Sequence, residues 1–209
     1  MECAPDLTQW LDELLRAIGL NKPHLMAHSY GGWQPALYTR DHSEELASLI
    51  LLSPAGTILP LPKGLFARAI LDGLLPFRAY TKYYLYWYDP VGARDDRTRW
   101  IIDELIEDSI LVRRCYKHRN FIRPTVLSDE DWHCIKVPIL FLVGEDDVRY
   151  SAEEAIAKLH RVAPEFKTAI APGADHHLTI VKPDWLIDKV LKFLSDQESG
   201  KQSAPRPRH

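Results

Sequence analysis

The sequence predicts an α/β fold built on a mostly parallel sheet, and two observations support this prediction. Short, almost wholly apolar runs alternate along the chain with segments in which apolar residues recur at helical spacing. Each apolar run ends in small or turn-forming residues, as expected of strands that are buried on both faces of a sheet. Strands that alternate with helices in this way are typical of parallel sheets with helices on both faces.

Four segments carry the strand signal. The expected strands lie within residues 22–28, 46–52, 137–143 and 166–170. The second of them reads Leu-Ala-Ser-Leu-Ile-Leu-Leu, and the third ends in a glycine. The carboxyl ends of parallel strands meet at one edge of the sheet, so we expect the residues that follow these strands to gather there.

Periodicity and capping signals predict the helices. Apolar residues recur at helical spacing over residues 7–18, with Asp6 positioned to cap that helix. Ser151 and Glu154 form the pattern of a capping box for a later helix. Pro183 stands where a proline opens a last amphipathic helix.

The chain divides into a core, an insertion and a tail. Residues 1–56 and 131–196 carry the alternating pattern of the core. Residues 57–130 show no convincing strand and much helix-compatible sequence, so we expect a helical lid inserted into the core. Residues 197–209 are polar and rich in proline, and we expect them to be disordered.

The composition argues against several classes of function. The 209 residues are 46% hydrophobic, 26% charged and carry a formal net charge of -3, so we expect neither nucleic acid nor a membrane as partner. The chain contains no apolar run of membrane-spanning length and no signal-peptide pattern at its start. The three cysteines lack zinc-type spacing and fit reduced thiols, so we expect a cytoplasmic protein.

Ser29 is the strongest indicator of function. It lies at the centre of Ala27-His28-Ser29-Tyr30-Gly31, between an expected strand and an expected helix. A serine at such a turn projects its hydroxyl above the sheet, and small neighbours let the strand and helix approach closely. The helix N-terminus also favours negative charge that develops beside the serine. The pattern indicates a nucleophile, and the alternative is a serine in an ordinary strand-to-helix turn.

Two further loops carry the groups that a serine nucleophile needs. A serine hydroxyl requires a base to take its proton, and the base requires an acid to fix its tautomer. Carboxylates follow the third expected strand at positions 145–147, and His176 and His177 follow the fourth. Four of these groups could also be imagined as a metal cluster: Asp146, Asp147, His176 and His177. They lack the short spacing of ligands on a helix, so we expect no metal.

With these residues in place, the chain resembles the α/β-hydrolase superfamily, and within it small bacterial carboxylesterases. The resemblance runs from about residue 7 to residue 194 and rests on the motif around Ser29, on Leu51-Leu52-Ser53-Pro54-Ala55, on residues 137–147 and on Pro172-Gly173-Ala174-Asp175-His176. It implies a partial α/β-hydrolase fold with a helical lid insertion. It also implies a serine hydrolase that cleaves small-molecule carboxylic esters through an acyl-enzyme intermediate and needs no cofactor.

The resemblance also implies roles for single residues. Asp147 would be the acid and His176 the base of a Ser-His-Asp triad with Ser29, and the Tyr30 N–H would donate to the oxyanion. Asp146 and Glu145 stay alternatives for the acid, as His177 does for the base. The substrate-binding candidates are His28, Trp33, Tyr83, Tyr84 and Trp87. The lid aromatics would otherwise form the insertion's own core, and His28 would be only the variable residue of the motif.

The sequence departs from the family's pattern at several points. Ala27 replaces the first glycine of the motif, Asp175 stands where glycine usually precedes the base, and Pro35 can distort the helix after Ser29. The family's upstream strands, with a loop that supplies a second oxyanion N–H, do not precede the first helix. We therefore expect a truncated hydrolase that self-associates through an exposed strand edge. The alternative to an esterase is a catalytically impaired hydrolase that acts as a binding or interaction protein.

Overall fold

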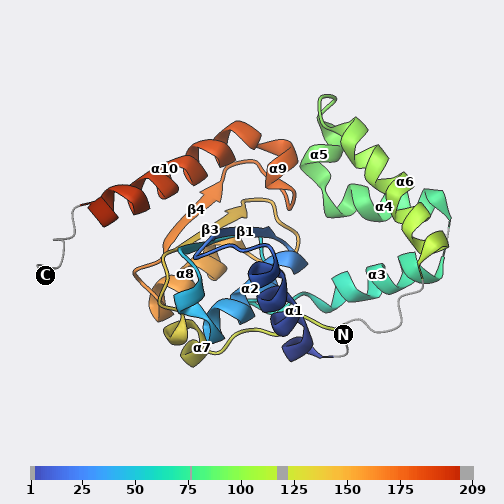
Figure 1. The fold of residues 1–209 in the computed structure, drawn as a ribbon. Coiled ribbons are helices and arrows are strands. Elements are labelled where there is room, and N and C mark those ends of the chain that lie inside the picture. Colours follow the sequence, from blue (N-terminus) through green and yellow to red (C-terminus); the bar gives the residue numbers. More distant parts are fainter. Residues whose placement is uncertain (1–2, 76, 117–121, 203–209) are drawn as a thin grey trace, which may run out of the picture.

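The computed structural model describes residues 3–75, 77–116 and 122–202 (Figure 1). Four parallel strands form one sheet in the order β1-β2-β3-β4. The strands are β1 (His24–His28), β2 (Ser48–Leu52), β3 (Ile139–Gly144) and β4 (Lys167–Ala171). Each overlaps its predicted segment, so the predicted α/β class with a parallel sheet is confirmed.

The strand pairing brings the carboxyl ends of the strands to the same edge of the sheet. His28 pairs with Leu52, Leu52 pairs with Leu142, and Leu142 pairs with Ala169. β2 and β3 are buried along their whole length, whereas β1 and β4 form the two edges of the described sheet. On the β1 edge, Met26 is 54% exposed. The loops that follow the strands therefore converge, as the sequence predicted.

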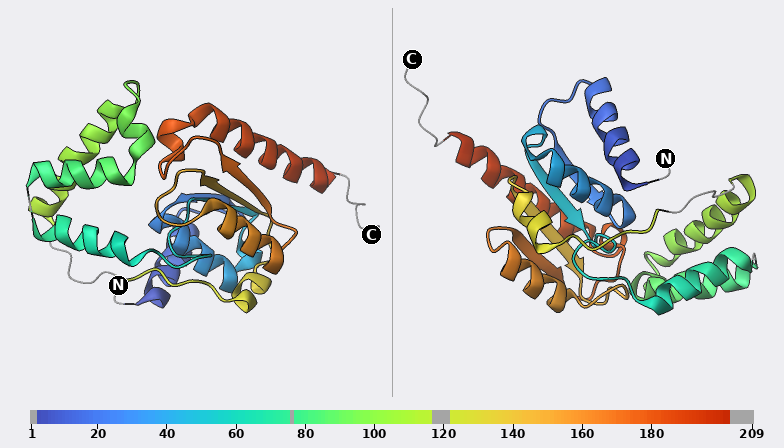
Figure 2. Two further views of the ribbon diagram at one scale, coloured as in Figure 1. Left: turned by 180° about the vertical axis from the view of Figure 1, so that it is seen from behind. Right: turned by 90° about the horizontal axis from the view of Figure 1, so that it is seen from below.

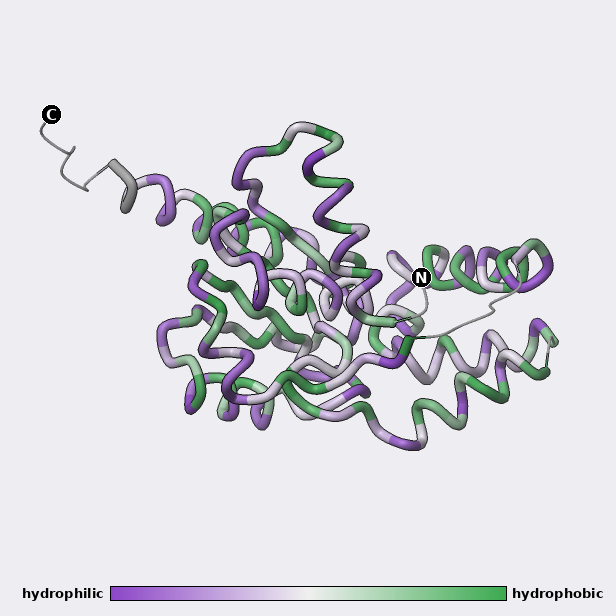
Figure 3. Tube along the Cα trace, turned by 60° about the horizontal axis from the view of Figure 1, so that its bottom comes forward, coloured by the Kyte–Doolittle hydropathy of each residue, from purple (hydrophilic) through white to green (hydrophobic). Residues whose placement is uncertain are grey.

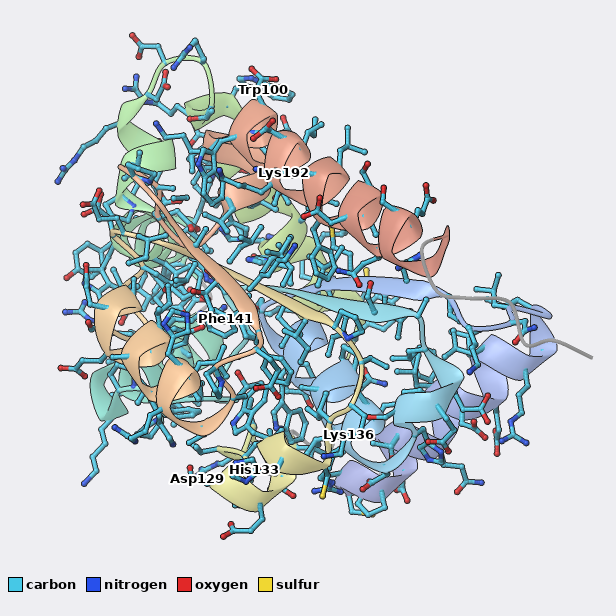
Figure 4. The ribbon with its side chains drawn as sticks, turned by 90° about the vertical axis from the view of Figure 1, so that its left-hand side faces the viewer. Trp100, Asp129, His133, Lys136, Phe141 and Lys192 are labelled. Atoms are coloured by element: carbon cyan, nitrogen blue, oxygen red, sulfur yellow. The ribbon has the colours of Figure 1, made fainter. Side chains whose placement is uncertain are left out.

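Helices cover both faces of the sheet (Figure 2). One face packs against α1 (Ala4–Ala17), α2 (Tyr30–Asp41), α7 (Asp129–Cys134) and α8 (Ala152–Val162). The other packs against α9 (Leu178–Val181) and α10 (Pro183–Gln202). Alternate side chains of the central strands enter the two cores, so Phe141 packs with the first set of helices and Leu142 with the second. Figure 4 shows Phe141 in the middle of the molecule, with Trp100 and Lys192 towards one end and Asp129, His133 and Lys136 towards the other.

Every regular element described in the insertion between β2 and β3 is a helix. A short 3-10 helix, η1 (Ser43–Glu45), precedes β2, and the insertion itself contains α3 (Lys63–Leu74), α4 (Arg78–Tyr88), α5 (Pro90–Arg94) and α6 (Arg99–Cys115). These helices stand beside the core (Figures 1 and 2), and hydrophobic and hydrophilic stretches alternate along them (Figure 3). None of the described helices is long and apolar enough to cross a lipid bilayer.

Several predicted helix boundaries are confirmed and others need correction. The Ser151 hydroxyl accepts the Glu154 N–H at 3.2 Å, as the predicted cap requires. The first helix begins at Ala4 with Cys3 as its N-cap, so Asp6 caps it from the first turn, where its carboxylate accepts the Cys3 N–H at 3.3 Å. Helix α2 continues through Pro35, whose carbonyl accepts the Thr39 hydroxyl at 2.6 Å. Helix α10 extends to Gln202, past the position at which we expected the tail to begin, and residues 203–209 lie outside the described residues.

Gly144 allows the loop after β4 to cross directly over the end of β3. A methyl group at Gly144 would lie 2.2 Å from the Asp175 carbonyl oxygen and 2.4 Å from that of Ala174. The Asp146 N–H donates to the same Ala174 carbonyl at 2.8 Å. Because the obstructing atoms belong to the backbone, no side-chain rotation would relieve the clash.

We expect Gly144→Ala to lower the free energy of unfolding by about 3 kcal/mol, because the added methyl group forces the two loops apart. Chemical denaturation of the variant measures this loss. Gly64→Ala in α3 is the matched control, since nothing lies within 4 Å of its added methyl group. That control should gain about 0.5–1 kcal/mol from lower unfolded-state entropy. Equal stabilities for the two variants would contradict the role assigned to Gly144.

Candidate active site

Ser29 occupies a strained turn between β1 and α2. Its φ of 63° and ψ of -130° are unusual for a residue with a side chain and cost on the order of 1–3 kcal/mol. The surrounding backbone holds it there: the Ser29 N–H donates to the Leu52 carbonyl at 2.9 Å, and its carbonyl accepts the Ala55 and Gly32 N–H groups, each at 2.9 Å. Strain at an exposed turn of this kind is expected where a side chain must be presented for function.

The close approach in this turn depends on the second glycine after Tyr30. A methyl group at Gly32 would lie 2.9 Å from Cβ of Pro54 and 3.3 Å from the Ala27 carbonyl. At Gly31, the glycine of the sequence motif, nothing lies within 4 Å of such a group. The packing of strand, helix and following loop therefore needs Gly32 more than Gly31.

The loops after β3 and β4 bring Asp147 and His176 together. Nδ1 of His176 lies 3.0 Å from Oδ2 of Asp147, and both side chains are fully buried. Glu145 and Asp146 are exposed instead, and Glu145 accepts the Gly173 N–H at 2.7 Å. Among the alternatives left open by the sequence, the geometry favours Asp147 as the partner of His176.

The Ser29 hydroxyl contacts an arginine rather than the histidine. Nη2 of Arg149 donates to Oγ of Ser29 at 2.7 Å, and it also donates to the Tyr88 hydroxyl. Nε2 of His176 is buried and has no hydrogen-bond partner among the described residues. Sequence reasoning missed Arg149, whose one signal is its position two residues after Asp147 in the loop that carries the candidate acid.

Burial dominates the electrostatics of this group. Burial and the positive charge of Arg149 hold the pKa of His176 well below its usual range. Burial likewise lowers the pKa of His28 to about 4. Burial raises the pKa of Asp147, and the Arg149 guanidinium opposes that rise. At neutral pH both imidazoles are thus uncharged, and Nε2 of His176 can accept a proton.

The loop that carries His176 is fastened to the insertion. Oδ2 of Asp175 accepts the N–H groups of Val91 and Gly92, each at 2.9 Å, at the start of α5. Nδ1 of His177 lies 2.6 Å from Oδ1 of the buried Asp89. The aspartate that stands where glycine is usual therefore has a structural role. His177 is paired with the insertion rather than with Ser29.

A pocket of about 530 Å³ opens beside Ser29 between the core and the insertion. Its lining is mostly apolar or aromatic and comprises Ser29, Tyr30, Ala55, Leu61, Leu65, Phe66, Ala69, Ile70, Tyr84, Tyr88, Arg123, Pro124 and Arg149. Tyr84 is the predicted lid residue in that lining. Tyr30 also faces the pocket, and its hydroxyl donates to the Ile122 carbonyl at 2.9 Å. Burial raises the pKa of the Tyr84 hydroxyl to about 12, which keeps this hydroxyl neutral at physiological pH.

The other predicted pocket residues lie elsewhere. Trp33 is fully buried in the core, where its Nε1–H donates to the Thr125 carbonyl at 3.1 Å. Tyr83 and Trp87 both contact Arg68: the Tyr83 hydroxyl accepts a hydrogen bond at 2.9 Å, and the Trp87 ring centre lies 4.4 Å from the guanidinium carbon. Helical periodicity cannot distinguish the pocket face of α4 from its outer face, because both carry aromatic residues.

The His28 ring lies against the ring of His176, the candidate base. The two ring centres are 4.4 Å apart, and Nε2 of His28 lies 2.9 Å from the His176 carbonyl oxygen. Together with His177 these imidazoles could offer ligand nitrogens that lie within 4.8 Å of one another. Ligands of a tetrahedral zinc ion would be about 3.3 Å apart. Where two of these nitrogens are as much as 4.8 Å apart, the rings would therefore have to move closer together to hold an ion.

The comparisons with known proteins identify the family of the chain. The profile of the alpha/beta hydrolase family matches residues 2–189. The chain is 24% identical over 193 residues to the uncharacterized carboxylesterase nap of Bacillus subtilis (strain 168), covering 91% of this chain and 62% of that protein. It is 22% identical over 209 residues to carboxylesterase YbfK of the same organism, and this match covers 93% of this chain and 64% of that protein. The chain thus spans less than two thirds of the length of the curated relatives it matches.

The fold is similar to that of a solved carboxylesterase. Against the crystal structure of carboxylesterase CesB (YbfK) from Bacillus subtilis, the TM-score is 0.80 at 23% sequence identity. The match covers 93% of this chain and 67% of that structure. At this identity the likeness concerns the fold, including the parallel sheet and its helices.

We expect Asp175→Ala to loosen the attachment of α5, because the buried Gly92 N–H and the partly buried Val91 N–H would lose their acceptor. The free energy of unfolding should fall by about 2 kcal/mol, and hydrogen exchange at the Val91 and Gly92 amides should accelerate. Asp188→Ala, at an exposed position of α10, is the control and should change stability by less than about 0.5 kcal/mol. Unchanged exchange at both amides would show that Asp175 does not hold the insertion in place.

Proposed function

The chain belongs to the alpha/beta hydrolase family, and from this premise we propose that it is a serine hydrolase that cleaves carboxylic esters. The observation that carries the proposal is the buried His176–Asp147 pair beside a strained Ser29, at the mouth of an apolar pocket. A nucleophile, a neutral base and a paired acid converge there from three separate loops. The carboxylesterases among the relatives support an ester as the substrate.

In the proposed reaction, Oγ of Ser29 attacks the ester carbonyl carbon while Nε2 of His176 takes the hydroxyl proton. Asp147 keeps the other ring nitrogen protonated and stabilises the imidazolium that forms. The carbonyl oxygen becomes an oxyanion, to which the Tyr30 N–H at the start of α2 donates. His176 then returns the proton to the leaving alcohol as the C–O bond breaks, and water releases the acyl group through the same base.

The reaction requires the Ser29 hydroxyl to donate to His176. In the structure Oγ accepts from Arg149, which leaves its proton and its second lone pair available, but Nε2 of His176 has no hydrogen-bond partner among the described residues. This observation also favours the second candidate function, a catalytically impaired hydrolase that acts as a binding or interaction protein. Labelling by a fluorophosphonate separates the two candidates, because only an activated serine reacts with it.

Location and self-association are also proposals. Cys3, Cys115 and Cys134 are free and exposed, which supports a reducing compartment and hence the cytoplasm. Self-association is supported by β1, which lies at an edge of the described sheet and exposes Met26. Sedimentation velocity would reject self-association if the chain stayed monomeric across micromolar concentrations.

We expect His176→Ala to reduce kcat/KM for a short-chain ester by about 10³-fold or more, because the proton of Ser29 then has no acceptor. Ser29→Ala should lose activity to a similar extent. His177→Ala is the matched control and should keep most of the activity, since His177 is paired with Asp89. Peptide mapping after fluorophosphonate treatment should place the label on Ser29. A label on Ser53, or equal losses from the two histidine variants, would contradict the assignment.

We expect the acid limb of the pH profile of kcat/KM to have its midpoint below the ordinary histidine pKa of about 6.5. Burial and the charge of Arg149 lower the pKa of His176. Other titratable groups that face its ring include Asp147, which pairs with Nδ1, and the neighbouring His28 and His177. A base with a lowered pKa stays unprotonated to lower pH, so activity is lost only as the pH falls through that lower value. Arg149→Met should move the midpoint upwards, and a wild-type midpoint above 6.5 would contradict this expectation.

A further inference from the structure

Arg149 places a positive charge in the wall of the pocket, immediately beside Ser29. The residue is only 5% exposed. Besides its contacts with Ser29 and Tyr88, Nη1 reaches the Ser53 carbonyl at 3.5 Å. The guanidinium carbon lies 5.2 Å from the centre of the Tyr88 ring. The charge therefore lies at the point where the reacting end of a substrate would be bound.

Among the described residues, no carboxylate lies within ion-pair distance of the Arg149 guanidinium, although the buried Asp147 and Asp89 interact with its charge at longer range. Its buried Nε has no hydrogen-bond partner among the same residues. Asp147 is close in sequence, but it accepts the backbone N–H of Arg149 at 2.9 Å and directs its other oxygen to His176. An anion that entered the pocket could form the direct ion pair that this guanidinium lacks and accept from its unpartnered Nε–H.

Resting on the function proposed above, we propose that the substrates are esters that carry a carboxylate of their own, and that Arg149 binds that carboxylate. The planar guanidinium matches a carboxylate in two parallel hydrogen bonds of about 2.8 Å. Since Nη2 lies 2.7 Å from Oγ of Ser29, a carboxylate so bound would lie roughly 6 Å from the carbon under attack. That distance corresponds to the monoester of a short dicarboxylic acid.

The remainder of the pocket is suited to the alcohol part of such an ester. Leu61, Leu65 and Ile70 line it with apolar surface that would accept an aliphatic or aromatic alcohol. Arg123 also lines the pocket, but its side chain is exposed and lies over the Phe66 ring at 5.7 Å. Its charge is thus hydrated and screened, and it attracts an anion less strongly than the buried Arg149 does.

The contact between Arg149 and Ser29 is compatible with catalysis. A serine hydroxyl has one proton and two lone pairs, so Oγ of Ser29 can accept from the guanidinium and still donate to the unpartnered Nε2 of His176. A neutral ester would leave the guanidinium without a direct ion pair, whereas a carboxylate ester would supply one. Arg149 is therefore a specificity-determining residue.

The test compares ethyl hydrogen glutarate with ethyl 5-methylhexanoate, in which an isopropyl group replaces the carboxylate. Released ethanol gives kcat/KM for both esters. We expect the wild-type chain to prefer the carboxylate ester at least 10-fold, and Arg149→Met to lower kcat/KM for that ester on the order of 30-fold or more. Arg149→Lys keeps the charge without the planar guanidinium, so its kcat/KM for the carboxylate ester should lie between those of the wild-type chain and Arg149→Met. Arg161→Met, on the exposed end of α8, is the control and should leave the preference unchanged.

A wild-type preference of one or less, or a preference that Arg149→Met leaves intact, overturns the proposal. Thermal unfolding of each variant shows whether a loss reflects misfolding, in which case Arg149→Lys carries the comparison. Calorimetric titration of Ser29→Ala with ethyl hydrogen glutarate tests the subsite without catalysis. If the wild-type chain hydrolyses neither ester, the proposed function fails. The carboxylate subsite still stands if the titration shows binding that the added Arg149→Met substitution weakens on the order of 30-fold, and it falls if binding is absent or independent of Arg149.

Discussion

The close approach of the loop after β4 to the end of β3 determines the rest of the site. Because Gly144 has no side chain, the carbonyls of Ala174 and Asp175 can lie directly over it. This crossing places the next residue, His176, beside Asp147, which leaves the same strand end. It also turns Asp175 towards the insertion. A single backbone contact thus fixes the imidazole–carboxylate pair and the attachment of α5 together.

The buried polar groups around this crossing are mostly paired, and the exceptions are informative. Asp175 accepts two N–H groups, and Asp147 accepts one N–H while its other oxygen pairs with His176. Nε2 of His176 and Nε of Arg149 stay unsatisfied among the described residues. Native proteins leave few such groups, and those that remain concentrate where a ligand or a reaction completes them. These two nitrogens are two of five such atoms among the described residues, and the other three are Oγ of Ser53, Oδ2 of Asp89 and Nε1 of Trp132.

The sequence predicted the features that depend on local pattern. Apolar runs marked the four strands, and the turn around Ser29 was recognisable because so close a turn from strand to helix needs small neighbours. Arg149 escaped notice because its importance comes from contacts with Ser29 and Tyr88, which are far away in the chain. The packing of Trp33 was equally hidden, since an aromatic residue early in a helix can face either a pocket or the core. Such choices depend on tertiary contacts, which periodicity does not encode.

The insertion takes part in the site through two separate connections. Helix α4 supplies Tyr88, which contacts Arg149 directly, and the start of α5 holds the loop of His176 through Asp175. A shift of the insertion would therefore move the guanidinium and the candidate base together. Tyr88, Arg149 and Ser29 all line the pocket between the core and the insertion, so a bound molecule would contact the first of these connections directly. Occupancy of the pocket and the contact between Arg149 and Ser29 would consequently be coupled.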